Sequence, residues 1–191
     1  NRDPEYKYPD TEELQRDSTK LFIDMMKIYF EKKMGTVEQI ANNIDLFLCG
    51  MTSLSNMSIG TVIRFMAHYG LYCKSIKNLG TSKHTKLLHD AIQLKDLGCF
   101  AMTELAHGSN VRGVQTTATY CPKTKSFILN TPSDHDIKFW IGNLGKNAHM
   151  AIVLAQLITK DKNEGVHCFV VPIRDRINHF PYPGIEIGDC G

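Results

Sequence analysis

The sequence lacks an excess of charge of either sign: 22 Lys and Arg residues stand against 20 Asp and Glu residues, which gives a formal net charge of +2. Positive and negative residues are interspersed along the chain. Nucleic-acid-binding domains instead gather basic residues on one face. The balance therefore gives no reason to expect a nucleic acid as a partner.

Long apolar runs are also missing. No stretch reaches the ~20 apolar residues that a membrane-spanning helix needs, so we expect no membrane span. The first residues, Asn1-Arg-Asp-Pro-Glu5, lack the pattern of a secretory signal. Hydrophobic residues make up 42% of the chain, charged residues 22%, and only 7 residues are proline. This is the composition of a globular protein, and 191 residues are enough for one or two small domains.

Paired cysteines are absent. The six cysteines are scattered without a Cys-x-x-Cys pair, at Cys49, Cys73, Cys99, Cys121, Cys168 and Cys190. This spacing excludes a small disulfide scaffold and a zinc ribbon, so we interpret them as reduced thiols of an intracellular protein. The eight histidines are also dispersed and lack metal-ligand spacing. The sequence therefore predicts no metal site.

Helical periodicity dominates the first half of the chain. Asp10 and Glu13 have the spacing of an N-terminal capping box, and an amphipathic helix is predicted from there to about Lys32. Its expected buried face consists of Leu14, Leu21, Phe22, Met25, Ile28 and Tyr29.

Three further helices are predicted before residue 95. The second begins at Thr36, ends near Gly50, and is expected to bury Ile40, Ile44, Phe47 and Leu48. The third covers 58–68, is interrupted at Gly70, and continues over 72–79 until Gly80 ends it. The fourth follows Thr81 and extends through Ile92.

The period of the apolar residues changes from helical to alternating after Gly98. The pattern predicts the end of a buried strand at Cys99–Met102, and a hairpin at 115–120 and 126–131 joined by a turn at 121–124. Further strands are predicted at 149–158, 165–173 and 183–187. Helices followed by strands indicate an α+β fold rather than βαβ units, with the boundary near residues 95–100.

A loop rich in small polar residues follows the first of these strands. It contains Thr103, Glu104, His107, Gly108, Ser109 and Asn110. Gly108 permits a close approach of the backbone, and Ser109 and Asn110 favour loop conformations. Such a loop can present hydrogen-bond donors to a flat polar ligand, although most loops of this composition are plain turns.

Three stretches carry a more specific resemblance. Cys-Phe-Ala-Met-Thr-Glu-Leu-Ala-His-Gly-Ser-Asn at 99–110 resembles the flavin loop of the acyl-CoA oxidase branch of the acyl-CoA dehydrogenase superfamily. Lys-Phe-Trp-Ile-Gly-Asn-Leu-Gly-Lys at 138–146 and Gly-Val-His-Cys-Phe-Val-Val-Pro-Ile-Arg at 165–174 resemble later stretches of the same family. They occur in the right order and at suitable separations, and the resemblance covers the chain from about residue 55 to its end.

The resemblance implies an N-terminal α-helical domain at 1–97 and a FAD-binding, β-barrel-like middle domain of the acyl-CoA dehydrogenase type at 98–191. The family's C-terminal helical bundle has no counterpart in the sequence. We therefore expect the chain to be a truncated or incomplete copy whose middle domain is partial. The family's catalytic base, a glutamate of that bundle, is then also missing, so no catalytic residue is assigned.

The implied activity is that of a peroxisomal, FAD-dependent acyl-CoA oxidase of fatty-acid β-oxidation. Such an enzyme converts acyl-CoA to trans-2-enoyl-CoA, reduces molecular oxygen to hydrogen peroxide, and forms a homodimer in the full-length family. The fragment alone is expected to be inactive. Glu104 is not assigned as the base, and His107 is interpreted as structural, since neither matches the family's base.

The resemblance also assigns binding roles. Thr103 matches the threonine that contacts the flavin, and Phe100 and Met102 match residues lining the flavin and acyl pocket, although both are also explained as core. Trp140, the single tryptophan, matches a residue packed on the flavin, and Gly142 agrees with the glycine of oxidases where dehydrogenases have threonine.

Gly108 and Ser109 match positions at the thioester end of the substrate. Two alternatives to the oxidase remain open. One is an acyl-CoA dehydrogenase that uses an electron-transfer partner, and the other is a non-catalytic acyl-CoA-binding or assembly module.

Overall fold

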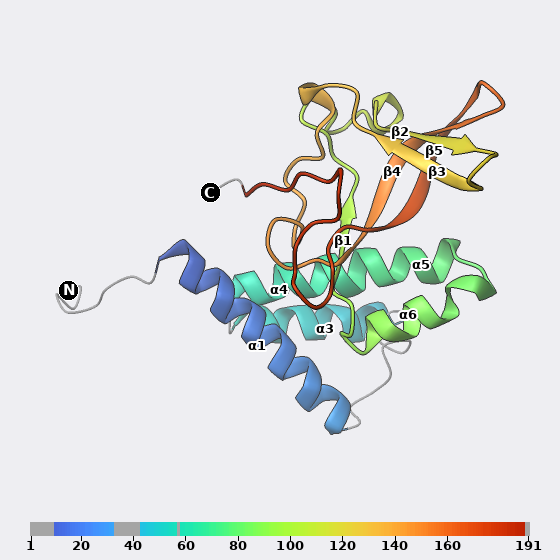
Figure 1. Ribbon diagram of the computed structural model, residues 1–191. Coiled ribbons are helices and arrows are strands. Elements are labelled where there is room, and N and C mark those ends of the chain that lie inside the picture. Colours follow the sequence, from blue (N-terminus) through green and yellow to red (C-terminus); the bar gives the residue numbers. More distant parts are fainter. Residues whose placement is uncertain (1–9, 33–42, 57, 190–191) are drawn as a thin grey trace. The chain divides into compact units, whose positions relative to one another are not determined.

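The computed structural model describes residues 10–32, 43–56 and 58–189 (Figure 1). Residue contacts divide the chain into two units between Gly70 and Leu71, and each unit is described by itself. None of the helices within the described ranges is long and apolar enough to cross a membrane.

The first helix of the N-terminal unit, α1 (Thr11–Glu31), begins where the capping residues predict. The backbone N–H of Glu13 donates to Asp10 Oδ1 over 2.7 Å, which satisfies one of the orphan donors at the helix start. Phe22 and Met26 are buried as an amphipathic helix requires.

Two members of the predicted buried face are wrong, because Leu14 and Ile28 are about half exposed, at 54% and 53%. The packed stripe of α1 passes through Gln15, Ser18 and Phe22, and both residues lie to one side of it.

Helix α4 (Ile59–Phe65) packs against α1 through polar contacts. Arg64 donates from Nε to Thr19 Oγ1 (2.7 Å) and from a terminal nitrogen to the carbonyl of Gln15 (3.0 Å). Gly60 permits the close approach, since a Cβ there would lie 2.9 Å from Ser18 Oγ. The two helices are therefore joined by both shape and hydrogen bonding.

Helix α3 (Ile44–Ser55) differs from the prediction at its C-terminal end. The helix passes through Gly50, where an added Cβ would meet no atom within 4 Å, so the glycine marks neither a close contact nor a break. Leu48 is 50% exposed rather than buried. The predicted start at Thr36 and the position of Ile40 lie outside the described residues.

Gly70 does not interrupt the third predicted helix. After α4 the backbone adopts a π-helical stretch, Met66–Cys73, and then continues as α5 (Lys74–Leu79) up to Gly80. A π-helical stretch absorbs an irregularity that would otherwise break the i→i−4 ladder. The spacing of apolar residues does not reveal such a stretch.

The fourth predicted helix begins with a 3₁₀ turn, Ser82–His84, followed by α6 (Thr85–Ile92). The backbone N–H of Thr81 donates to Nδ1 of His84 over 3.0 Å, which closes the N-terminal end. The α-helical segments α5 and α6 both belong to the second unit.

The sheet of the second unit has five strands: β1 (Gly98–Ala101), β2 (Thr117–Cys121), β3 (Ser126–Asn130), β4 (Met150–Thr159) and β5 (Lys162–Pro172). Strands β2 and β3 form the predicted hairpin, with Tyr120 opposite Phe127. The helices and the mixed sheet confirm the predicted α+β class. The domain boundary at residue 97 stays a prediction.

Strand β4 pairs with three of the other four strands of this sheet. It pairs antiparallel with β5, while β1 and β2 pair parallel with successive stretches of β4: Gly98 aligns with Met150, and Thr117 with Gln156. A strand covered on both faces is expected to show a continuous apolar run, as β4 does over Ala151–Ala155. The chain therefore leaves the sheet after β1, passes through residues 102–116, and pairs with β4 again at β2.

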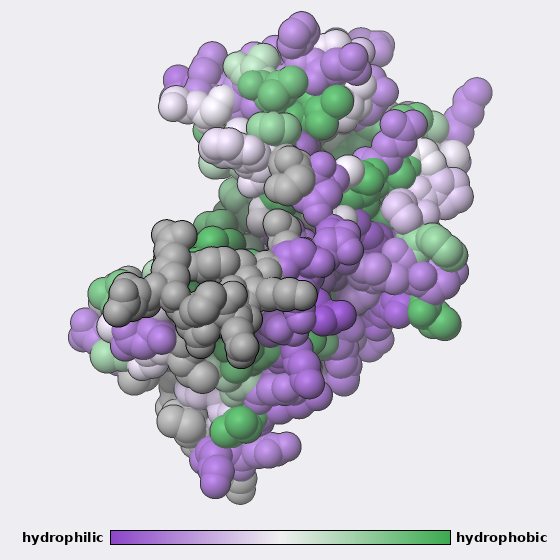
Figure 2. All heavy atoms as spheres, turned by 90° about the vertical axis from the view of Figure 1, so that its left-hand side faces the viewer, coloured by the Kyte–Doolittle hydropathy of each residue, from purple (hydrophilic) through white to green (hydrophobic). Residues whose placement is uncertain are grey.

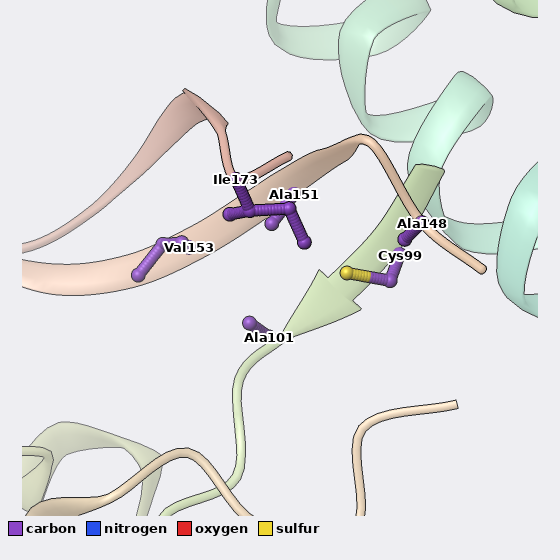
Figure 3. Close-up of a cluster of buried hydrophobic side chains, with 6 residues drawn as sticks. All are labelled: Cys99, Ala101, Ala148, Ala151, Val153 and Ile173. Atoms are coloured by element: carbon purple, nitrogen blue, oxygen red, sulfur yellow. The ribbon is translucent and has the colours of Figure 1, made fainter. Parts of the chain in front are cut away.

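Side chains from β1, β4 and the end of β5 meet in the core of the sheet unit. Figure 3 shows Cys99 and Ala101 of β1 facing the same space as Ala151 and Val153 of β4. All are at most 8% exposed, and Ile173 completes the cluster. The core cluster thus includes Ala101, the last residue of β1 before the 102–116 segment begins.

One predicted strand is wrong. Residues 183–187 form a turn and an irregular segment, and Gly184 has a φ of +83°. A left-handed residue interrupts extended pairing. The nearest strand-like feature is an isolated bridge between Arg174 and Pro181.

Gly98 gives a test of packing in this unit. A Cβ at Gly98 would lie 2.2 Å from the ring of the fully buried Tyr72. We expect Gly98→Ala to lower the free energy of unfolding by about 2 kcal/mol, since overpacking forces a backbone or ring shift. Urea unfolding followed by far-UV circular dichroism measures it. Gly50→Ala, where a Cβ meets nothing, is the control and should not destabilise; equal losses in both variants would contradict the packing account.

Candidate functional site

The carboxylate of Glu104 lies at the centre of the segment that leaves β1. Glu104 is 1% exposed and forms an isolated antiparallel bridge with Lys138. A buried carboxylate must be compensated by hydrogen bonds or charge. The neighbouring residues of the loop supply that compensation.

Five donors surround the two carboxylate oxygens. Oε1 accepts from the backbone N–H and the hydroxyl of Thr116 (2.9 and 2.6 Å) and from Lys138 Nζ (3.2 Å). Oε2 accepts from the backbone N–H of Gln115 (2.8 Å) and pairs with His107 Nδ1 (2.9 Å). The carboxylate therefore joins three separate parts of the chain.

The pKa of Glu104 reflects two opposing effects. Burial raises it, but the hydroxyl of Thr116, the backbone N–H groups of Gln115 and Thr116, and the charge of Lys138 together lower the pKa from 4.5 to about 2. For Lys138, burial lowers the pKa and outweighs the attraction of the carboxylate. Glu104 is thus held as an anion.

This arrangement agrees with leaving Glu104 unassigned as a catalytic base. A general base needs a free lone pair within reach of the proton that it abstracts. Both oxygens of Glu104 already accept at least two bonds, and the side chain is fully buried. His107 closes a tight turn, since its backbone N–H and that of Glu104 each donate to the other's carbonyl over 3.1 Å.

Glu104, His107 and Asp136 also bring ligand-type atoms within 4.8 Å of one another. The position is poorly suited to a cation, because Lys138 Nζ already supplies a positive charge 3.2 Å from Glu104 Oε1. The arrangement favours an ion pair over a metal site, and the absence of a metal stays a prediction.

Two loop segments are paired beside this carboxylate. The backbone N–H of Phe139 donates to the carbonyl of Thr103 (3.0 Å), and that of Leu105 to the carbonyl of Ile137 (2.9 Å). Lys138 Nζ adds a bond to the carbonyl of Met102 (3.0 Å). Thr103 and Trp140, which separate motifs predict to contact the flavin, therefore belong to two neighbouring loop segments that are joined by backbone hydrogen bonds; the two paired segments, 102–105 and 137–140, are called the ribbon below.

Trp140 is held in an unusual way. Its side chain is 81% exposed and its φ is +58°, a left-handed conformation that is uncommon for a bulky residue. The indole stacks on Phe139 with an interplanar angle of 20°. Figure 2 shows apolar residues in green among polar ones in purple on the surface of the sheet unit. A large flat apolar group presented at a cost in strain suggests a ligand.

An open hollow of about 780 Å³ lies along this segment. It is lined by Phe139, Trp140, Gly142 and Gly145 on one side and by residues 186–189 on the other. A second hollow of about 640 Å³ lies over the core face of the sheet. Five residues line both hollows: Ile137, Lys138, Leu144, Glu186 and Ile187. The segments 137–144 and 186–187 therefore border both.

The remaining predicted residues lie along the other strand of the ribbon and its loop. Phe100, Met102 and Thr103 are half-buried at the end of β1, whereas Gly108 and Ser109 are exposed in the loop. A Cβ at Gly108 would meet nothing within 4 Å. The structure thus places Met102, Thr103 and Trp140 in or next to the paired segments, Phe100 in β1 and Gly142 two residues beyond Trp140. The two predicted substrate residues lie in the exposed loop at 108–109.

Comparison with known proteins points to a family. Residues 99–190 match the family described as acyl-CoA dehydrogenase, middle domain. The peroxisomal acyl-coenzyme A oxidase 2 of Arabidopsis thaliana is 43% identical over 159 residues, which are 80% of this chain and 23% of the relative. Acyl-CoA oxidase 3 of Yarrowia lipolytica superposes with a TM-score of 0.84 at 34% identity, over 96% of this chain and 25% of that one. These matches support placing the chain among the acyl-CoA oxidases.

A further oxidase structure bears on ligands. Acyl-CoA oxidase-2 of Caenorhabditis elegans, bound with FAD, ascaroside-CoA and ATP, is 28% identical with a TM-score of 0.65, over 93% of this chain and 30% of that one. The chain spans about a quarter of the length of these acyl-CoA oxidases.

Sequence reasoning misses two partners of Glu104 in this oxidase fold. The strand pattern includes Thr116 only as a strand residue, and Lys138 belongs to a motif that gives it no role. They lie 12 and 34 residues from Glu104, and no spacing rule joins residues brought together by a loop. The one sequence feature that points to these contacts is a carboxylate placed directly after a buried strand, which must find partners inside the fold.

The depressed pKa of Glu104 predicts a pH-dependent stability. Since the folded-state pKa (about 2) lies below the unfolded value (4.5), the carboxylate stabilises the fold fully above pH 4.5, and this contribution of roughly 3 kcal/mol disappears as the pH falls to 2. Glu104→Gln should therefore be less stable at pH 7, by an amount that shrinks towards pH 2. Urea midpoints at pH 7, 5 and 3 measure the trend, and a constant difference would contradict it.

Proposed function

We propose that this chain supplies two parts of the active site of an FAD-dependent acyl-CoA oxidase. The first is the segment 137–144, here called the flavin wall, and the second is the loop 107–110, here called the thioester-facing loop. The observation that carries the proposal is Trp140, an exposed indole in a left-handed conformation on a segment tied to Thr103. The family resemblance supplies the chemistry that such an arrangement would serve.

The residues on the ribbon fit an isoalloxazine ring. Trp140 and Phe139 offer stacked aromatic faces, and the exposed Gly142 adds no side chain to the hollow. Thr103 would direct its hydroxyl and backbone to the polar edge of the flavin, with Phe100 and Met102 packed beside it. When bound, FAD supplies the hydride acceptor of the reaction.

The loop at 107–110 would receive the substrate's thioester end. Gly108 is open, with no atom within 4 Å of a Cβ position, and Ser109 is exposed beside it. Pairing with Glu104 holds this loop in place before a ligand arrives, which lowers the entropic cost of binding. We assign acyl-CoA to this side on the family resemblance.

The overall reaction converts acyl-CoA and O₂ to trans-2-enoyl-CoA and H₂O₂. The acyl chain loses an α proton and a β hydride, and oxygen takes up the two electrons. Within the described residues the chain offers binding groups for this reaction, and the base is assigned by resemblance to the family's C-terminal bundle. A peroxisomal setting and a homodimeric partner are proposed on the same resemblance.

The single tryptophan gives a direct test of flavin binding. FAD absorbs where tryptophan emits, so FAD stacked near Trp140 should quench most of the emission of this chain in a saturable titration. Gly142→Leu should raise the dissociation constant at least tenfold (~1.4 kcal/mol), because a side chain would enter the hollow.

Gly50→Leu, in α3 of the other unit, is the matched control and should leave the titration unchanged. Far-UV circular dichroism must show that both variants stay folded. Saturable binding that is equal in the wild-type chain and Gly142→Leu would mean that Gly142 lies away from the flavin.

The oxidase and dehydrogenase hypotheses differ in the oxidative half of the reaction. We expect FAD bound to this chain, once reduced chemically and freed of unbound flavin, to reoxidise within seconds in air with one H₂O₂ formed per flavin. The measurement follows flavin absorbance and peroxide together. Slow reoxidation in air that an electron-transfer flavoprotein accelerates would favour the dehydrogenase instead.

A further inference from the structure

We propose that Glu104 and Lys138 form a positioning pair that fixes the flavin wall against the thioester-facing loop. The assignment of flavin to one surface and of the acyl thioester to the other rests on the proposed function. The pair itself rests on contacts within this chain, so its effect on the loops can be measured without either ligand.

Lys138 connects the pair to the flavin wall. Its ammonium, on a side chain only 11% exposed, lies 3.2 Å from Glu104 Oε1 and 3.0 Å from the carbonyl of Met102. Trp140 follows two residues later on the same segment. The ion pair therefore sets how far the indole lies from the Met102–Thr103 segment.

The second oxygen of Glu104 connects the pair to the loop. Oε2 accepts from Gln115 N–H at 2.8 Å and meets His107 Nδ1 at 2.9 Å, so it holds the two ends of the stretch that carries Gly108 and Ser109. One carboxylate thereby fixes both walls relative to β1.

Backbone hydrogen bonds alone do not fix the flavin wall relative to the thioester-facing loop. They pair 103–105 with 137–139 and would persist without the carboxylate. Removing the negative charge of Glu104, however, leaves the buried ammonium with only the weaker attraction of Asp136 among the charges that act on it, which is unfavourable. We expect the Lys138 side chain then to turn towards water and to give up its bond to the carbonyl of Met102, so that the two walls lose their shared contact and become more mobile while the backbone pairing and the sheet remain.

The chain contains a matched control pair. Lys162 and Glu164 lie 2.9 Å apart in the β4–β5 hairpin, with their side chains 72% and 36% exposed. Exposed pairs of this kind contribute little. Substituting the same residue types there tests whether burial and the shared contacts, rather than the ion pair as such, produce the effect.

The experiment uses the full chain and compares Glu104→Gln, Lys138→Met and the double variant with Glu164→Gln and Lys162→Met. Time-resolved anisotropy of Trp140 without FAD measures the mobility of the flavin wall, and FAD titration measures its binding function. We expect each single variant at the pair to shorten the rotational correlation time of Trp140 and to weaken FAD binding about tenfold. The double variant should be no worse than either single one, because the interaction is shared.

Lys138→Arg should restore both readouts, because a guanidinium can donate to Glu104 and to the carbonyl of Met102 together. If Glu104→Gln does not fold, the contrast between Lys138→Met and Lys138→Arg decides the question. Unchanged Trp140 anisotropy in Lys138→Met, or equal changes in the control variants, would overturn the positioning role. A wild-type chain that binds no FAD would overturn the proposed function and leave the anisotropy result to judge the pair.

Discussion

The requirement to compensate one buried negative charge organises the site. Glu104 lies where the chain leaves β1, and its oxygens draw in the backbone of 115–116, the imidazole of His107 and the ammonium of Lys138. An unpaired carboxylate at this depth would cost several kcal/mol. The loop and the neighbouring segment must therefore converge on it, and the surfaces that they present to ligands follow from that convergence.

The sheet supplies the rigid reference for this convergence. Strand β4 pairs with β1, β2 and β5, and the small side chains Ala101, Ala151 and Ala148 keep the cluster behind the site tightly packed. The site combines a fixed sheet with a loop closed by charge. Such a combination would hold the proposed binding groups in place before a ligand arrives.

Much of the fold could be predicted from local patterns. Asp10 marks the start of α1, and alternation over 115–131 identifies the β2–β3 hairpin, because caps and turns act over a few residues. The errors arise where packing or backbone geometry overrides the pattern. Gly70 is absorbed in a π-helical stretch, and a left-handed Gly184 prevents a strand at 183–187.

Resemblance assigns residue types to the site, and those assignments stay predictions, but it does not reveal the hydrogen bonding around Glu104. Motif matches indicate Thr103, Trp140 and Gly142, and the structure sets their two segments side by side. Nothing in the spacing of Glu104, Thr116 and Lys138 indicates that they share one carboxylate. Such contacts depend on how the loop closes, and only the three-dimensional arrangement reveals them.

The parallel pairing of β1 and β2 with one strand also bears on how this fold can diversify. Since each occupies its own stretch of β4, both ends of the intervening segment are anchored independently of what lies between them. Residues inserted, deleted or exchanged between His107 and Gly113 leave the register of every strand intact while Glu104, Gln115 and Thr116 are kept. The sequence of the 107–113 loop can therefore change in evolution while the pairing of the sheet is unchanged.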